Sequence, residues 1–181
     1  MALTSRVGLD SDALTFLSQA MSIGYDPACD SSEVAAERVA MLRIFLYADH
    51  PLYVTPTVTR QYEAIESENR RLAHWDLHRF HICDAFGNVA PPPDEKRIGY
   101  LRSLHSGVED CRIAAEAEQA ALTLLLSRDS HFAKRLNPVL RGLHIQRPTE
   151  YWERLGIRRG TRPRSEPVAE SPLSAATWWK W

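Results

Sequence analysis

The apolar run at residues 122–126 limits the possible folds more than any other stretch of the chain. It is too short for a helix, and it is continuously apolar, whereas a strand with one solvated face would alternate. Apolar residues at helical spacing precede it from Ile113 onward, and residues 130–136 are predicted to form another helix. A buried strand between two helices is typical of a parallel sheet with helices on both faces.

Aspartates stand at the junctions between these predicted elements. Asp129 follows the buried run, and Asp110 begins the helix before it. Near the start of the chain, residues 5–9 are predicted to form a strand, and Asp10 separates them from a helix at 13–21. Open α/β sheets bind ligands at the carboxyl ends of their strands. We therefore expect Asp10 and Asp129 at one edge of the sheet, with Asp110 nearby; helix capping is the alternative role for each.

Three neighbouring carboxylates predict a metal site. Like charges in a partly dehydrated cleft repel, which raises their pKa values and destabilises the fold. A bound hard cation removes that repulsion, and Mg²⁺ or Mn²⁺ uses carboxylates together with water and substrate phosphate. Asp10, Asp110 and Asp129 are the predicted catalytic and metal-binding residues.

The remaining pattern predicts one domain at residues 1–158, with a His-rich insertion at about 66–106. A Pro-rich tail at 159–181 ends in a Trp cluster, which we expect to dock on its own domain or on a second protomer; stacking on nucleobases is the alternative. Other predicted elements are helices at 31–46, from Val58 onward, 95–104 and 149–155, and strands at 52–54 and 143–145.

The His-rich insertion leaves two interpretations open. His74, His78 and His81 recur at one-turn spacing with Cys83 just beyond, and His pairs one turn apart can bind zinc. No CxxC or HExxH pattern accompanies them, so packing or a substrate-facing surface is favoured over a metal role.

Charge and cysteine usage indicate possible partners and the cellular compartment of the chain. The formal net charge is −1, but residues 128–164 are rich in arginine, and Arg128, Lys134 and Arg135 are candidates for binding nucleic acid; a solvated surface is equally compatible. Three unpatterned cysteines favour a reducing cytoplasm over a disulfide framework. We expect no membrane segment and no secretory signal.

Five segments together resemble a PIN domain. They are VGLDSDAL, LYVTPTVTRQYEAI, EDCRIAAEA, LLLSRDSHF and LHIQRPTEYW, and they cover about residues 6–155 apart from the His-rich middle. The resemblance implies a three-layer α/β/α sandwich with a central parallel sheet. It also implies a Mg²⁺- or Mn²⁺-dependent ribonuclease, and many bacterial members are toxins that pair with an antitoxin. An antitoxin protein and a homodimer are thus expected partners besides RNA.

Residue by residue, the resemblance places the family's aspartates at Asp10, Asp110 and Asp129. Ser127 matches a residue that supports the last acid. The family's glutamate falls on Gln61, and a helix turns about 100° per residue, so the nearby Glu63 points elsewhere.

This departure leaves three possibilities. Either Glu63 or Glu66 substitutes through a local shift, or the amide of Gln61 is tolerated, or the chain is a weakened, binding-only member. Asp12 is a further acid near the site.

A phosphotransferase of the haloacid dehalogenase type is a rival interpretation of the Asp10-x-Asp12 pair. It requires a threonine soon after the second aspartate, and Thr15 is badly spaced for that role. It also requires a late lysine with an acidic pair, which Lys134 lacks. The nuclease interpretation is therefore favoured.

Overall fold

The structure is a computed structural model, and it describes residues 5–167 and 171–181. Five parallel strands form one sheet in the order β3-β2-β1-β4-β5. The strands are β1 (Val7–Leu9), β2 (Leu52–Val54), β3 (Cys83–Asp84), β4 (Leu124–Leu126) and β5 (His144–Gln146). The α/β class with a central parallel sheet is confirmed.

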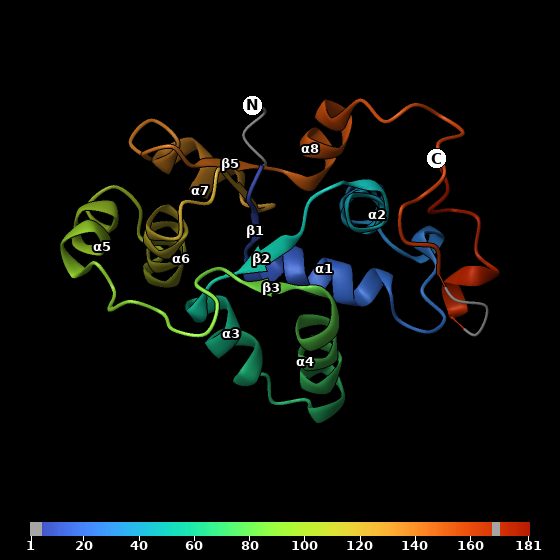
Figure 1. The fold of residues 1–181 in the computed structure, drawn as a ribbon, viewed down its shortest axis with the longest axis horizontal. Coiled ribbons are helices and arrows are strands. Elements are labelled where there is room, and N and C mark those ends of the chain that lie inside the picture. Colours follow the sequence, from blue (N-terminus) through green and yellow to red (C-terminus); the bar gives the residue numbers. More distant parts are fainter. Residues whose placement is uncertain (1–4, 168–170) are drawn as a thin grey trace.

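Helices cover both faces of this sheet (Figure 1). Connections between parallel strands are right-handed. After β3 the chain crosses to the other side of β1 to add β4 and β5, so the later helices lie on the opposite face of the sheet. Figure 1 shows α5, α6 and α7 on one side and α1, α2 and α8 on the other. The helices are α1 (Ser11–Ala20), α2 (Ser32–Tyr47), α3 (Pro56–Glu63), α4 (Glu68–His81), α5 (Glu95–Arg102), α6 (Val108–Gln119), α7 (Ser130–Leu136) and α8 (Pro148–Leu155), with short 3₁₀ turns at Pro27–Cys29 and Pro172–Ser174.

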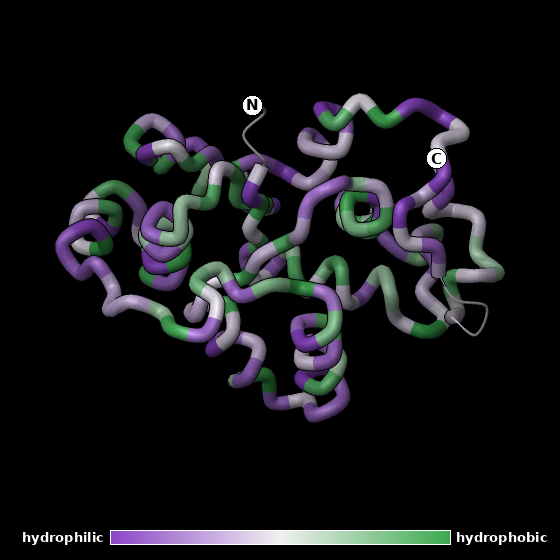
Figure 2. Tube along the Cα trace, in the orientation of Figure 1, coloured by the Kyte–Doolittle hydropathy of each residue, from purple (hydrophilic) through white to green (hydrophobic). Residues whose placement is uncertain are grey.

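The neighbouring strands β1 and β4 are buried along their whole length. Leu9 of β1 pairs with Leu126 of β4, and both side chains are fully buried. Along the outer helices, hydrophilic and apolar residues alternate within each turn (Figure 2), as expected for helices with one buried face. The sheet order reverses between β1 and β4, and the carboxyl ends of strands at such a point form the ligand crevice of open α/β folds.

The segment expected as an insertion at about 66–106 supplies α4, α5 and the edge strand β3. β3 consists of Cys83 and Asp84, which pair with Tyr53 and Val54 of β2. Both residues of β3 are exposed, so no apolar run marked this strand in the sequence. The segment therefore extends the sheet and does not lie outside it.

Two buried glutamates hold the first turns of short helices. Glu116 of α6 accepts from the backbone N–H and the hydroxyl of Thr57, at 3.0 and 2.7 Å. Glu37 of α2 does the same for Thr149, at 3.1 and 3.0 Å, and also accepts from Arg147 Nε at 2.7 Å. Each threonine follows the proline that begins its helix, where backbone N–H groups have no partner within the helix. A distant carboxylate thus caps α3 and α8.

The C-terminal tryptophans pack on the same chain. The guanidinium of Arg43, on α2, donates to the carbonyls of Trp178, Trp179 and Lys180, each at 3.1 Å. It also lies 4.7 Å from the centre of the Trp181 ring. The indole of Trp181 thus adds a cation–π contact to its buried area.

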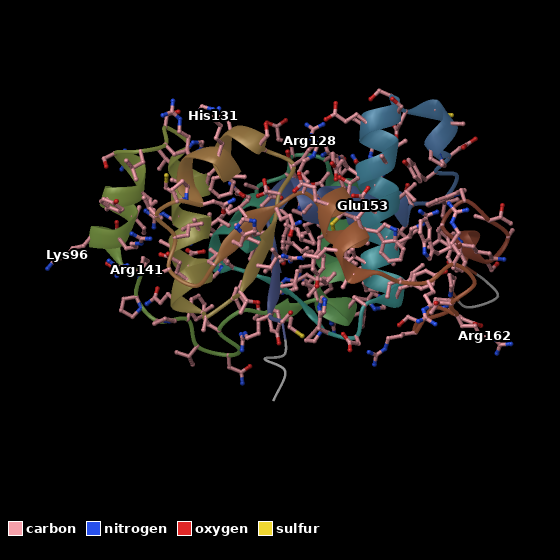
Figure 3. All side chains as sticks on the ribbon, turned by 90° about the horizontal axis from the view of Figure 1, so that it is seen from above. Lys96, Arg128, His131, Arg141, Glu153 and Arg162 are labelled. Atoms are coloured by element: carbon pink, nitrogen blue, oxygen red, sulfur yellow. The ribbon has the colours of Figure 1, made fainter. Side chains whose placement is uncertain are left out.

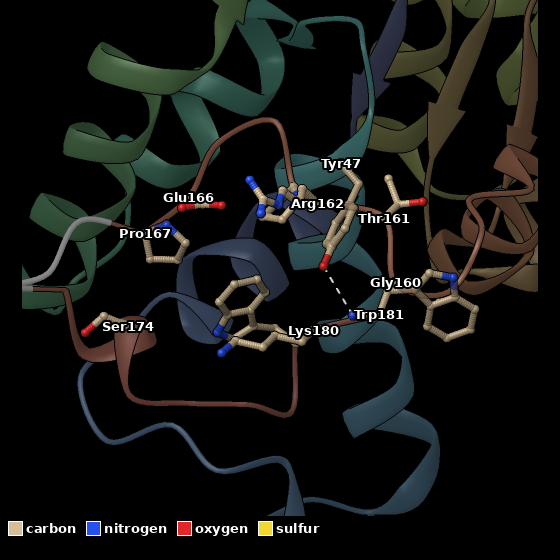
Figure 4. A pocket seen from close by; sticks show the side chains of 11 residues that line it. Tyr47, Gly160, Thr161, Arg162, Glu166, Pro167, Ser174, Lys180 and Trp181 are labelled. Atoms are coloured by element: carbon tan, nitrogen blue, oxygen red, sulfur yellow. Dashed lines mark hydrogen bonds between the residues drawn. The ribbon is translucent and has the colours of Figure 1, made fainter.

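A pocket lies between this tail and the end of α2 (Figure 4). It encloses about 330 Å³, and the backbone N–H of Trp181 donates to the Tyr47 hydroxyl at its wall, at 3.2 Å. Arg162, Glu166 and Lys180 also line it. Among the described residues, the lining contains none of the predicted site aspartates.

Candidate active site

Asp10 is a buried carboxyl at the carboxyl end of β1. It caps α1, with Oδ1 accepting from the Ala13 N–H at 2.7 Å, and the residue is only 9% exposed. The pKa of Asp10 is raised from 3.8 to about 7, mainly by burial. Hydrogen bonds from Ser127 and Ala13 oppose this rise, and the charges of Asp12 and Asp110 add to it. A positive charge placed here would remove most of that penalty.

Asp110 lies in the first turn of α6, with a side chain that is 40% exposed. Its Oδ2 accepts from His105 Nε2 at 3.1 Å. Gly107 makes this approach possible: a Cβ there would overlap the Asp110 carboxylate and lie 2.7 Å from His105 Nε2. Glycine at this helix start therefore serves the placement of an acid.

Asp129 caps α7 and is linked to Asp10 through Ser127. Its Oδ1 accepts from the N–H groups of His131 and Phe132, at 2.8 and 3.0 Å. The fully buried Ser127 accepts from the Asp129 N–H at 3.1 Å through its hydroxyl oxygen, and that hydroxyl donates to Asp10. Ser127 thus joins the ends of β1 and β4.

Gln61 reaches the site from α3. The Ser11 hydroxyl donates to its Oε1, and Ser11 directly follows Asp10. Glu63 is exposed, and its position on α3 lies about 200° around the helix axis from Gln61. Asp12 is exposed in the first turn of α1 and acts on Asp10 through its charge. The amide, and not a neighbouring glutamate, occupies the site edge.

The oxygen donors fit a hard divalent cation in their chemistry. In the part of the chain that the structure describes, no three Asp, Glu, His or Cys side chains converge closely enough to hold a metal ion. The three predicted aspartates therefore do not form one compact group. Asp129 Oδ1 caps the first turn of α7. Mg²⁺ commonly uses one or two carboxylates and completes its shell with water and substrate phosphate. Asp10 and Asp110, whose charges act on each other, are the two carboxylates that would supply such donors.

The three histidines of α4 diverge in their contacts. His74 is buried, and its Nε2 lies 3.0 Å from Thr15 Oγ1. Burial lowers the pKa of His74, which favours the neutral ring. His78 Nδ1 lies 2.7 Å from the Tyr62 hydroxyl, and His81 packs edge-on against a ring of α2. These contacts indicate packing.

The predicted nucleic-acid residues are exposed near Asp129. Arg128, Lys134 and Arg135 all face solvent, and the Arg128 guanidinium lies 5.2 Å from the ring centre of Phe16. Figure 3 shows Arg128 and His131 along the same margin of the molecule. Arg147 differs, since its guanidinium donates to Glu37 of α2, the glutamate that caps α8.

Sequence reasoning missed His105 and Glu116. Both are buried and polar. The partner of Glu116 lies 59 residues away along the chain, and His105 contacts Asp110 across a turn, outside any helix period. His105 precedes Gly107 and Asp110 closely in the sequence. This spacing indicates a contact only once the start of α6 at Val108 is known.

No protein-family model and no curated protein matches this chain. One similar solved structure is FitAcB from Neisseria gonorrhoeae, with 14% sequence identity and a TM-score of 0.46 over 78% of this chain and 97% of that one. Every helix within residues 5–167 and 171–181 is too short or too polar to span a bilayer.

Proposed function

We propose that this protein is a Mg²⁺- or Mn²⁺-dependent endoribonuclease that hydrolyses RNA phosphodiester bonds. The observation that carries the proposal is Asp10, a carboxyl buried at the topological switch point with a pKa raised to about 7 and with the charge of Asp110 acting on it. Structural interiors avoid such an arrangement unless a ligand offsets it. The PIN-like sequence segments agree with this class of reaction.

Each residue has a distinct part in the proposed chemistry. Asp10 and Asp110 would hold the cation, which when bound lowers the pKa of a coordinated water and neutralises charge on the phosphate. Ser127 holds the Asp10 carboxylate in place through its hydroxyl. Asp129 keeps the first turn of α7 formed, next to the exposed Arg128, and the cations of α7 attract the RNA backbone.

Gln61 favours a second candidate function. An amide at the position of the family's glutamate supplies no negative charge, so the cation would be held with one carboxylate less. The alternative is a catalytically weakened PIN-like module that binds RNA or a protein.

A cleavage assay separates the two. Single-stranded RNA and DNA are incubated with Mg²⁺, Mn²⁺ or EDTA, using the wild type, Asp10→Asn and the exposed control Glu153→Gln. We expect metal-dependent RNA cleavage that is lost in Asp10→Asn and kept in the control. Cleavage by Asp10→Asn at the wild-type rate contradicts the nuclease, and RNA binding in EDTA without any cleavage supports the binding module.

We extend the proposal to a toxin that acts in the cytoplasm and is held by an antitoxin, following the resemblance to bacterial PIN toxins. Expression of the wild type alone is then expected to arrest growth, and Asp10→Asn to relieve the arrest. Growth arrest by both proteins would contradict a toxin that acts through this site.

A further inference from the structure

His105 is a buried histidine that no part of the proposed reaction uses. It is 6% exposed and lies between α5 and α6. Its backbone N–H donates to the Leu101 carbonyl at 3.0 Å, and its own carbonyl accepts from the Cys111 thiol at 3.4 Å. These contacts fix the backbone from which the ring projects.

One edge of the ring meets Asp110. An ionised carboxylate only accepts hydrogen bonds, so His105 Nε2 carries the proton in the 3.1 Å bond to Asp110 Oδ2. His105 Nδ1 is buried and has no hydrogen-bond partner among the described residues. Gly107 leaves the space that this pair needs, because a Cβ would collide with both partners.

The face of the ring meets α7. The His105 ring centre lies 5.5 Å from that of Phe132 and 5.7 Å from that of His131. The backbone N–H groups of these same two residues donate to Asp129 Oδ1. A shift of the His105 ring would therefore disturb both its bond to Asp110 and the packing of the residues that hold Asp129.

We propose that His105 is a positioning residue that sets the carboxylate of Asp110, and through α7 that of Asp129, for cation and phosphate binding. This inference rests on the proposed metal-dependent function. Hydrogen-bond partners of metal-ligating side chains orient those ligands, and their loss commonly lowers metal affinity by about 10- to 100-fold. His105 acts in this way from the buried side of the site.

A matched pair of variants tests the hydrogen bond. His105→Gln places an amide N–H where Nε2 lies, whereas His105→Asn is too short to reach Asp110, and both place a polar amide in the same buried site. His144→Gln, on the exposed edge of β5, is the control. The readouts are the Mn²⁺ dissociation constant without RNA, from the electron paramagnetic resonance of free Mn²⁺, and the single-turnover cleavage rate.

We expect His105→Asn to weaken Mn²⁺ binding by about tenfold or more and His105→Gln to restore most of it. Wild-type Mn²⁺ binding and cleavage in His105→Asn would overturn the positioning role and leave the nuclease intact. A wild type that binds no Mn²⁺ would overturn both.

A second measurement leaves His105 unchanged and needs no metal. In Asp110→Asn, whose side chain is partly exposed, the nitrogen resonances of the His105 ring and the backbone amide resonances of His131 and Phe132 should shift. Amide resonances of His131 and Phe132 that match the wild type would overturn the link from Asp110 to α7.

Discussion

Replacing Asp10 by asparagine is expected to stabilise the metal-free protein while removing its cleavage activity. Burial raises the pKa of Asp10 from 3.8 to about 7. Each pH unit between those values corresponds to about 1.4 kcal/mol, so the ionised carboxylate destabilises the folded chain by on the order of 4 kcal/mol. Asparagine carries no charge and remains a good N-cap, so it keeps the bond from Ala13 without that penalty.

The sign of the pH dependence follows from which state holds the proton. Between pH 3.8 and about 7 the folded protein keeps the Asp10 proton and the unfolded chain does not. The free energy of unfolding of the wild type therefore falls as the pH rises through that range, and it stops falling above about pH 7. Asp10→Asn lacks this dependence.

Urea denaturation in EDTA, at several pH values between about 5 and about 8, measures the difference. The free energy of unfolding of the variant minus that of the wild type should grow by about 1.4 kcal/mol for each pH unit up to neutrality and then stay constant. Adding Mn²⁺ at the highest pH should stabilise the wild type and not the variant. A stability difference that stays constant with pH would refute the argument from burial.

Three further outcomes are expected. Gly107→Ala should weaken Mn²⁺ binding and cleavage by about tenfold, because the added Cβ displaces the Asp110 carboxylate. The urea midpoint should change little, because alanine tolerates the backbone conformation of residue 107. Glu116→Gln should lower the free energy of unfolding by about 1–3 kcal/mol in urea, since an amide N–H then faces the donors of Thr57. Trp179→Ala should lower it by about 3 kcal/mol and speed cleavage of the tail by trypsin, because this indole is buried.

The sequence predicted the central sheet because its strongest signals are local. The continuous apolar run before Asp129 and the strand–acid–helix pattern around Asp10 each need only a few neighbouring residues to be recognised. The structure places both acids at the carboxyl ends of adjacent strands, as expected. Gln61 lies on α3 and accepts a hydrogen bond from the Ser11 hydroxyl.

The parts that sequence reasoning did not reach depend on distant partners. β3 is two exposed residues long, and only its pairing with β2 makes it a strand. Glu37 and Glu116 have the pattern of solvated helix residues, yet each is buried because a threonine of another helix donates to it twice. The role of His105 likewise requires the placement of α7.

The two capping glutamates, Glu37 and Glu116, also bear on the unfolding rate of the protein. Their bonds join positions 59 and 112 residues apart along the chain. Helices as short as α3 and α8 have little stability alone, so their first turns gain these bonds only after distant elements have docked. Contacts that form after the folding barrier slow unfolding and leave the folding rate almost unchanged. We therefore expect the loss of either glutamate to speed unfolding more than it slows folding.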